Sequence, residues 1–216
     1  MKAIFFRHAL RFPGNAILTI LSLLAIRVLL HRQLHFGFLV WNIFLAVLPL
    51  FAARAAVRTK SIRTGILLSA VWLLLFPNAA YLVTDIVHLR ITPGSLFWLD
   101  LVLLFGAALL GMVLSIRSLY EIEIFWSRYL LPQWIPVLSA AALLASGYGI
   151  YLGRVERWNS WDALLQPLAL LHDIFNDFRH PIRNREAWEL TGLFATLQIG
   201  SYYLSRSVPG RRSPSH

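Results

Sequence analysis

Long apolar runs recur along nearly the whole chain, separated by short polar or basic stretches. Several runs approach the length of about 20 residues that an α-helix needs to cross a bilayer, and others are somewhat shorter. The runs cover about residues 13–30, 36–53, 62–84, 96–116, 134–153 and 187–204. The pattern predicts an all-α, polytopic bundle of about six transmembrane helices, which forms one integral membrane domain over residues 1–216.

A more polar stretch lies between the fifth and sixth runs, and its apolar residues recur at intervals of four, three, four and three. This spacing places one apolar stripe along a helix, and Pro167 suits a first helical turn. The stripe consists of Leu164, Leu168, Leu171, Phe175 and Phe178. We expect an amphipathic helix over about 164–178 that either lies on the outer membrane surface or packs over the bundle on the same side.

The composition excludes a water-soluble surface. The hydrophobic set makes up 58% of the chain and the charged set 14%, whereas about a quarter of the residues in soluble domains are charged. The formal net charge is +10, but the basic residues form short clusters between the spans, as juxtamembrane anchors do. Membrane lipids are therefore the expected partners, and nucleic acid is not.

The distribution of the 20 Lys and Arg residues predicts an orientation. Twelve fall in one set of alternating segments and eight in the other. Because cytoplasmic segments carry the excess of Lys and Arg, the first set should be cytoplasmic, together with both termini. Arg27 and Arg54, near span ends, are expected to snorkel to the interface.

Polar residues gather at the opposite, outer ends of the spans, where they are costly and mark candidate sites. Asn78, Tyr81, Asp85 and His88 are three, four and three residues apart, which places them on one face of a continuous helix. Pro77 removes a backbone donor just before them, so a kink is expected there. The fourth span begins near Ser95, a candidate N-cap, and carries Asp100, and the second span carries Asn42 near its start. The end of the fifth span and the segment that follows it add Tyr151, Arg154, Arg157, Asn159 and Asp162.

Each residue also has a structural explanation. Asp100 can complement a helix dipole, and Asp85 with His88 can form a solvated pair at a helix end. Trp41, Trp98, Trp158 and Trp161 have the positions of an interfacial aromatic belt. The convergence of several spans at one depth favours a site. The cytoplasmic halves of the predicted spans carry no carboxylate or histidine, which disfavours a transporter with a binding site near the midplane.

Four segments of this chain resemble the DUF1361 family. They are WNIFLAVLP at 41–49, FPNAAYLVTDIVHL at 76–89, WLDL at 98–101 and GYGIYLGRVERWNSWD at 147–162. The resemblance implies a polytopic protein of the bacterial inner membrane with no assigned activity. The motifs are the same segments that carry the outer polar residues, and a shared packing core would give the same coincidence.

The first functional hypothesis is a pocket at the outer leaflet that binds or processes a lipid-linked or anionic ligand. Arg154 and Arg157 would hold a phosphate or carboxylate, and His88 would be a general acid or base oriented by Asp85 or Asp100. The remaining ligand-binding candidates are Asn42, Asn78, Tyr81, Tyr151, Asn159 and Asp162.

Asp85 and His88 are also metal-ligand candidates, because carboxylate and imidazole groups three residues apart on a helix can share an ion. His31 and His35, four residues apart in the first outer loop, could add ligands, but the loop is too short for the helical spacing to be reliable, so a metal site is the less favoured form of this hypothesis. These candidate residues do not indicate a particular cofactor, and they do not show whether the protein is an enzyme. The second hypothesis is a non-enzymatic subunit or assembly factor of a membrane complex with a protein partner, and the third is a transporter.

Overall fold

The computed structural model of the chain describes residues 13–32, 34–91 and 94–207. The basic residues at both termini that entered the orientation argument lie outside these ranges, and the side chain of His31 is also outside the described set. Every regular element in the described part of the chain is helical, in agreement with the predicted all-α class. The elements are α2 (Gly14–His31), α3 (Phe38–Arg58), α4 (Ile62–Leu75), α5 (Pro77–Tyr81), η1 (Leu82–Ile91), η2 (Gly94–Leu96), α6 (Phe97–Trp126), α7 (Trp134–Arg154), α8 (Asp162–Leu165), α9 (Pro167–Arg179) and α10 (Arg185–Ser207).

Four helical stretches of the described chain are long and apolar enough to cross a membrane. They are Phe38–Arg58, Ile62–Arg90, Gly94–Trp126 and Trp134–Arg154. Gly14–Leu30 is a shorter apolar helix, and α10 is not among the four. The protein is thus a membrane-embedded helical bundle, because water cannot solvate the apolar side chains that these helices expose.

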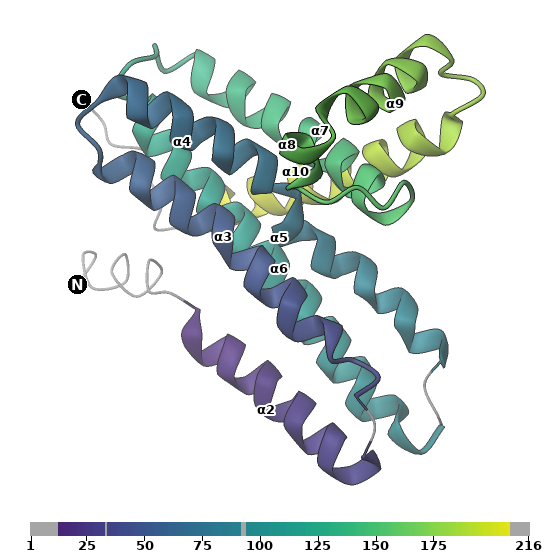
Figure 1. Cartoon of the computed structure of the whole chain (residues 1–216). Helices are drawn as coiled ribbons and strands as arrows, with labels where there is room; N and C mark the ends of the chain where they lie inside the picture. The colour runs from purple at the N-terminus through teal and green to yellow at the C-terminus, as the bar shows by residue number, and fades with distance from the viewer. Residues whose placement is uncertain (1–12, 33, 92–93, 208–216) are drawn as a thin grey trace, which may run out of the picture.

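The long helices run alternately up and down. One end of the bundle bears the connections 59–61 and 127–133, and we call it the basic end. Away from the basic end, α7 ends beside Tyr81 and is followed by the connection 155–184, while α2, η1 and the start of α6 continue further, to the connection 32–37 (Figure 1). We call this side of the bundle the long-loop end. In Figure 1, α3 and α6 run side by side along the bundle, and α9 lies beside the start of α10 at the upper right.

Helix α6 extends ten residues beyond the predicted span end at 116, to Trp126. The charged residues Arg117, Glu121 and Glu123 interrupt the apolar run in the sequence, yet Leu119, Ile122 and Phe125 keep a helical spacing and are buried. The extension carries Glu123 into the bundle, where its carboxylate accepts hydrogen bonds from Ser139, Tyr202 and Arg206. The sequence analysis found no carboxylate in the halves of the spans that lie toward the basic end. Glu123 is such a carboxylate, and it was missed because the predicted fourth span ended at 116.

The kink expected at Pro77 coincides with an interruption of the α-helix between α4 and α5, at Phe76. After α5 the chain winds as a ten-residue 3-10 helix, η1, so the continuous α-helical face predicted for Asn78 to His88 is not formed. In a 3-10 helix residues three apart lie above one another, which keeps Asp85 and His88 aligned.

Two glycines allow α5 to lie tightly between α6 and α7. A Cβ atom at Gly111 of α6 would lie 2.3 Å from the carbonyl oxygen of Ala79, and one at Gly149 of α7 would lie 2.4 Å from Cγ of Pro77. Real Cβ atoms do not approach so closely, so both positions require glycine. This close packing holds α5 beside the last turns of α7, where the candidate site lies.

Candidate functional site

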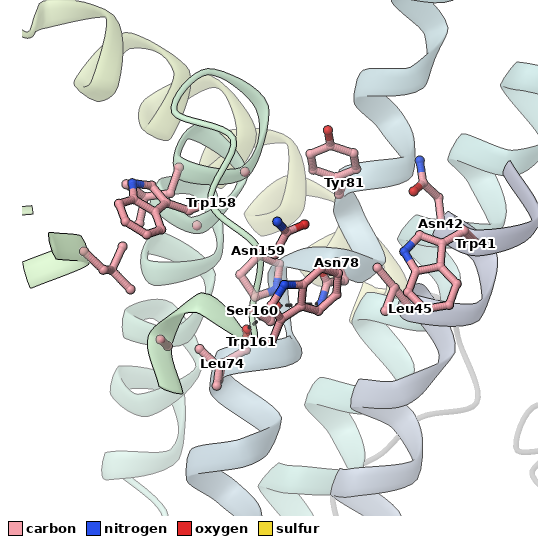
Figure 2. Close-up of a pocket in the computed structure, with 16 residues that line it drawn as sticks. Trp41, Asn42, Leu45, Leu74, Asn78, Tyr81, Trp158, Asn159, Ser160 and Trp161 are labelled. Atoms are coloured by element: carbon pink, nitrogen blue, oxygen red, sulfur yellow. Dashed lines mark hydrogen bonds between the residues drawn. The ribbon is translucent and has the colours of Figure 1, made fainter. Parts of the chain in front are cut away.

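A pocket of about 180 Å³ lies at the long-loop end, between α3, α5, α7 and the connection that follows α7. Its aromatic and polar lining consists of Trp41, Asn42, Asn78, Tyr81, Trp158, Asn159, Ser160 and Trp161. Figure 2 shows Asn78 and Ser160 in the middle, with Trp41 and Trp158 on opposite sides. None of the described residues that line the pocket is charged at neutral pH.

The connection after α7 is held over the pocket by hydrogen bonds to three helices, α4, α5 and α9. Nδ2 of Asn78 donates to Oγ of Ser160 at 3.0 Å, and Oγ of Ser160 donates to the carbonyl of Leu74 at 3.3 Å. Nε1 of Trp158 donates to Oδ2 of Asp173 in α9 at 3.1 Å. The rings of Trp41 and Trp161 meet edge to face at 6.4 Å between their centroids. The loop thus forms one wall of the pocket in a fixed position.

Three of the predicted ligand-binding residues shape this connection or pack beside it without lining the pocket. Oδ2 of Asp162 accepts from the backbone N–H of Asn159 at 2.7 Å and from its Nδ2 at 3.2 Å, which closes a local turn. The hydroxyl of Tyr151 donates to Glu156 at 2.8 Å. Arg157 is exposed and has a φ of 63°, in the left-handed region that few non-glycine residues adopt.

Asp85 lies behind the pocket lining and is only 1% exposed. Its Oδ2 accepts from Nδ2 of Asn42 at 2.9 Å, while its Oδ1 has no hydrogen-bond partner. The nearest cation is Arg154, whose Nη1 is 3.8 Å from Oδ1 and donates a long hydrogen bond of 3.5 Å to the hydroxyl of Tyr81. Asn42 and Tyr81 therefore connect the pocket wall to this buried carboxylate and its cation.

His88 is near Asp85 but does not pair with the carboxylate. Its Nδ1 is 3.1 Å from the backbone carbonyl oxygen of Asp85, and its ring packs on Phe38 at 4.6 Å between the centroids. Within the described residues no three His, Cys, Asp or Glu side chains gather in a way that could hold a metal ion. His35 is exposed in the connection that precedes α3.

Asp100 belongs to a separate, buried ion pair. Nε and Nη2 of Arg27 donate to its two carboxylate oxygens at 2.6 and 3.1 Å, and the side chains are 3% and 0% exposed. The guanidinium of Arg27 also lies over the ring of Phe36, at 4.3 Å from its centroid. Arg27 therefore does not snorkel, and Asp100 joins α2 to α6 rather than facing His88.

The structure divides the predicted site residues into three groups. Asn42, Asn78, Tyr81 and Asn159 line the pocket, and Asp85 and Arg154 lie behind it. The others lie outside the lining, namely His88, Asp100, Tyr151, Arg157 and Asp162. The sequence analysis did not include Ser160, and it assigned the pocket tryptophans to an interfacial belt. The place of Trp158, Ser160 and Trp161 in the motif WNSWD, around Asn159, was the signal that pointed to these three residues, whereas Trp41 directly precedes Asn42 in the motif WNIFLAVLP.

A family model with the description "Protein of unknown function (DUF1361)" matches residues 41–200. The match covers well over half of the chain. The chain belongs to the DUF1361 family. The segment that this DUF1361 protein shares with the family model includes every residue that lines the pocket, whereas α2 with Arg27 precedes it. Comparisons with curated proteins and with solved structures found no match.

Proposed function

We propose that this DUF1361 protein is a multi-pass protein of the bacterial inner membrane whose pocket binds the polar headgroup of a lipid-linked ligand, or another extracytoplasmic ligand. The observation that carries the proposal is the lining of three indole rings and three Asn side chains around one small pocket. Such a combination of apolar surface and a few convergent polar groups is typical of ligand sites.

The lining chemistry defines which ligand groups would fit. Asn amides offer both donors and acceptors, so they can pair with hydroxyl groups. Indole rings offer flat apolar faces, against which a sugar ring or another rigid polar ring would pack. A volume of about 180 Å³ is below the roughly 300–1,000 Å³ of drug-sized sites. The pocket would therefore hold one headgroup unit and leave an attached lipid chain outside, against the membrane.

An anionic group on the ligand would interact with Arg154 rather than Arg157. Arg154 is 30% exposed, and its ion pair with Asp85 is long, at 3.8 Å. A phosphate at the edge of the pocket beside Tyr81 would therefore compete for a guanidinium that is incompletely paired. Because the described lining offers no carboxylate or imidazole, these residues supply binding rather than proton transfer.

The proposed orientation places the long-loop end outside the cell and both termini in the cytoplasm. It is supported by the basic residues of the described chain that lie toward the basic end, which are Arg54, Arg58, Lys60, Arg63, Arg117, Arg128 and Arg206. The acidic residues of the described chain at this end are Glu121 and Glu123. With the five basic residues near the two ends of the sequence, this basic set has twelve Lys and Arg residues, against eight in the segments on the opposite side. Cytoplasmic segments of membrane proteins carry such an excess of Lys and Arg. In this orientation α9 lies along the outer membrane surface, with its exposed apolar stripe in the lipid.

Replacement of Trp161 by Leu is expected to reduce the ligand that co-purifies with the protein at least about fivefold. A stacked aromatic ring contributes on the order of 1–3 kcal/mol to binding, whereas the exposed position of Trp161 predicts little change in stability. The measurement is native mass spectrometry of the detergent-solubilised protein, with the melting temperature measured on the same samples.

Trp98→Leu is the matched control, because Trp98 is an exposed tryptophan at the same end of the bundle and does not line the pocket. It should keep the ligand. Equal retention by the wild type and both variants would contradict the proposed pocket, as would equal loss in both variants.

The second candidate function is a subunit or assembly factor of a membrane complex. It is favoured by the apolar side chains that α8 and α9 leave exposed, which are Leu164, Leu168, Leu171, Phe175 and Phe178. A stoichiometric protein partner in the same mass spectra, lost on replacement of Leu168 and Phe175 by Ser, would support this function. Transport is less well supported, because the pocket lies at one end of the bundle.

A further inference from the structure

A second concavity lies at the basic end of the bundle, on the opposite end of the same helix pair that carries Trp41 and Leu74. It is an open groove of about 600 Å³ between the last turns of α3 and the first turns of α4. The groove is lined by Phe51, Arg54, Ala55, Arg58, Thr59, Thr64 and Leu68. It shares no lining residue with the pocket at the long-loop end, so it can be tested separately.

The polar rim of the groove is basic. Arg54 and Arg58 are four residues apart on α3, so their side chains leave the same face of the helix. Arg54 is partly buried and pairs with Glu121 at 3.3 Å. Arg58 is exposed, and within the described part of the chain it forms no ion pair. The hydroxyls of Thr59 and Thr64 add hydrogen-bonding groups to the same rim.

The apolar floor of the groove continues toward the membrane interior. Phe51 is exposed, and Phe44 is exposed seven residues earlier on the same face of α3. On α4, Leu68 lies one turn beyond Thr64, and the exposed Val71 follows it. About 26 Å of helix separates Arg58 from Trp41, which is close to the roughly 30 Å hydrocarbon core of a bilayer. The basic rim therefore lies at the level of lipid headgroups when Trp41 lies at the opposite interface.

We propose that this groove is a binding site for an acidic phospholipid. The phosphate is held by Arg58 with Thr59 and Thr64, at the edge of the positive field that Arg54 contributes. One acyl chain lies along Phe51 and Leu68. Basic pockets between membrane helices on the cytoplasmic side recognise anionic headgroups in this way. The proposal does not depend on the ligand of the pocket at the long-loop end.

The test compares the full-length protein in nanodiscs of phosphatidylcholine alone and of phosphatidylcholine with phosphatidylglycerol. Phosphatidylglycerol should raise the melting temperature of the wild type and remain bound in native mass spectra. Arg58→Gln should weaken its retention about fivefold, because one basic residue contributes about 1 kcal/mol to the binding of acidic lipid. Thr64→Val should weaken retention without changing the charge of the protein.

Arg128→Gln is the matched control, since Arg128 is exposed at the same end and does not line the groove. It should retain phosphatidylglycerol like the wild type. An equal loss in Arg128→Gln and Arg58→Gln would overturn the proposal in favour of diffuse electrostatic attraction. Displacement of the lipid by millimolar inorganic phosphate would also overturn it, because the groove would then be a site for a soluble anion. Full retention by both groove variants would contradict the site outright.

Discussion

Replacement of Arg27 by Gln is expected to lower the free energy of unfolding by about 3–5 kcal/mol, the usual cost of stranding one partner of a buried ion pair. Both hydrogen bonds from the guanidinium reach the carboxylate of Asp100, which is fully buried. Gln can replace at most one of these bonds and supplies no positive charge. The loss should appear as a fall in the melting temperature of the detergent-solubilised protein.

Two further variants separate the ion pair from a general effect of losing an arginine. Asp100→Asn in the Arg27→Gln background should restore part of the stability, because the stranded charge is removed. Arg185→Gln should leave the melting temperature nearly unchanged, because the pair of Arg185 with Glu189 is exposed. A stable Arg27→Gln protein would contradict the structural role assigned to Asp100.

Arg154→Gln is the second large expected effect, at about 2–4 kcal/mol of lost stability. The variant would leave Asp85 buried with one hydrogen bond, from Asn42, and with no cation within 4 Å among the described residues. The expected loss is smaller than for Arg27, because the 3.8 Å pair is longer and Arg154 is 30% exposed. The melting temperature and the retained ligand are measured on the same samples.

Asp85→Asn combined with Arg154→Gln should recover much of the stability, since an amide needs no counter-ion. If the single variant is instead as stable as the wild type but has lost its co-purifying ligand, Arg154 is a ligand-binding residue and the pair with Asp85 is incidental. If the double variant is stable and keeps the ligand, Arg154 acts only on the packing behind the pocket.

The sequence pattern predicted the helices well where an apolar run is long and uninterrupted, as in α3 and α7. It failed at α6, where the predicted span ended at 116, before Arg117, although the helix continues to Trp126. Hydrogen bonds from Ser139, Tyr202 and Arg206 allow Glu123 to be buried in this continuation. Those partners are 16, 79 and 83 residues away in the sequence. No local pattern indicates such distant pairs.

In the candidate site too, the sequence predicted contacts between residues that are close in the sequence and missed contacts between residues that are far apart in it. Spacing placed Asn78 and Tyr81 near one another, and the structure has both in the pocket lining. Asp100 was grouped with Asp85 because both lie near outer span ends, but its partner Arg27 is 73 residues earlier. The place of Trp158 and Ser160 in the wall depends on bonds to α9 and α4 that form only after the helices have packed.

The most direct test of the central claim, a membrane-embedded bundle whose pocket opens on the extracytoplasmic face, is cysteine accessibility in intact cells. The chain has no cysteine, so each single-cysteine variant reports one position. Asn159→Cys is at the pocket, and Lys60→Cys is in the exposed connection at the basic end. The account predicts that a membrane-impermeant maleimide labels Asn159→Cys in intact cells and labels Lys60→Cys only after the cells are permeabilised. Labelling of Lys60→Cys in intact cells, with Asn159→Cys protected until permeabilisation, would contradict it.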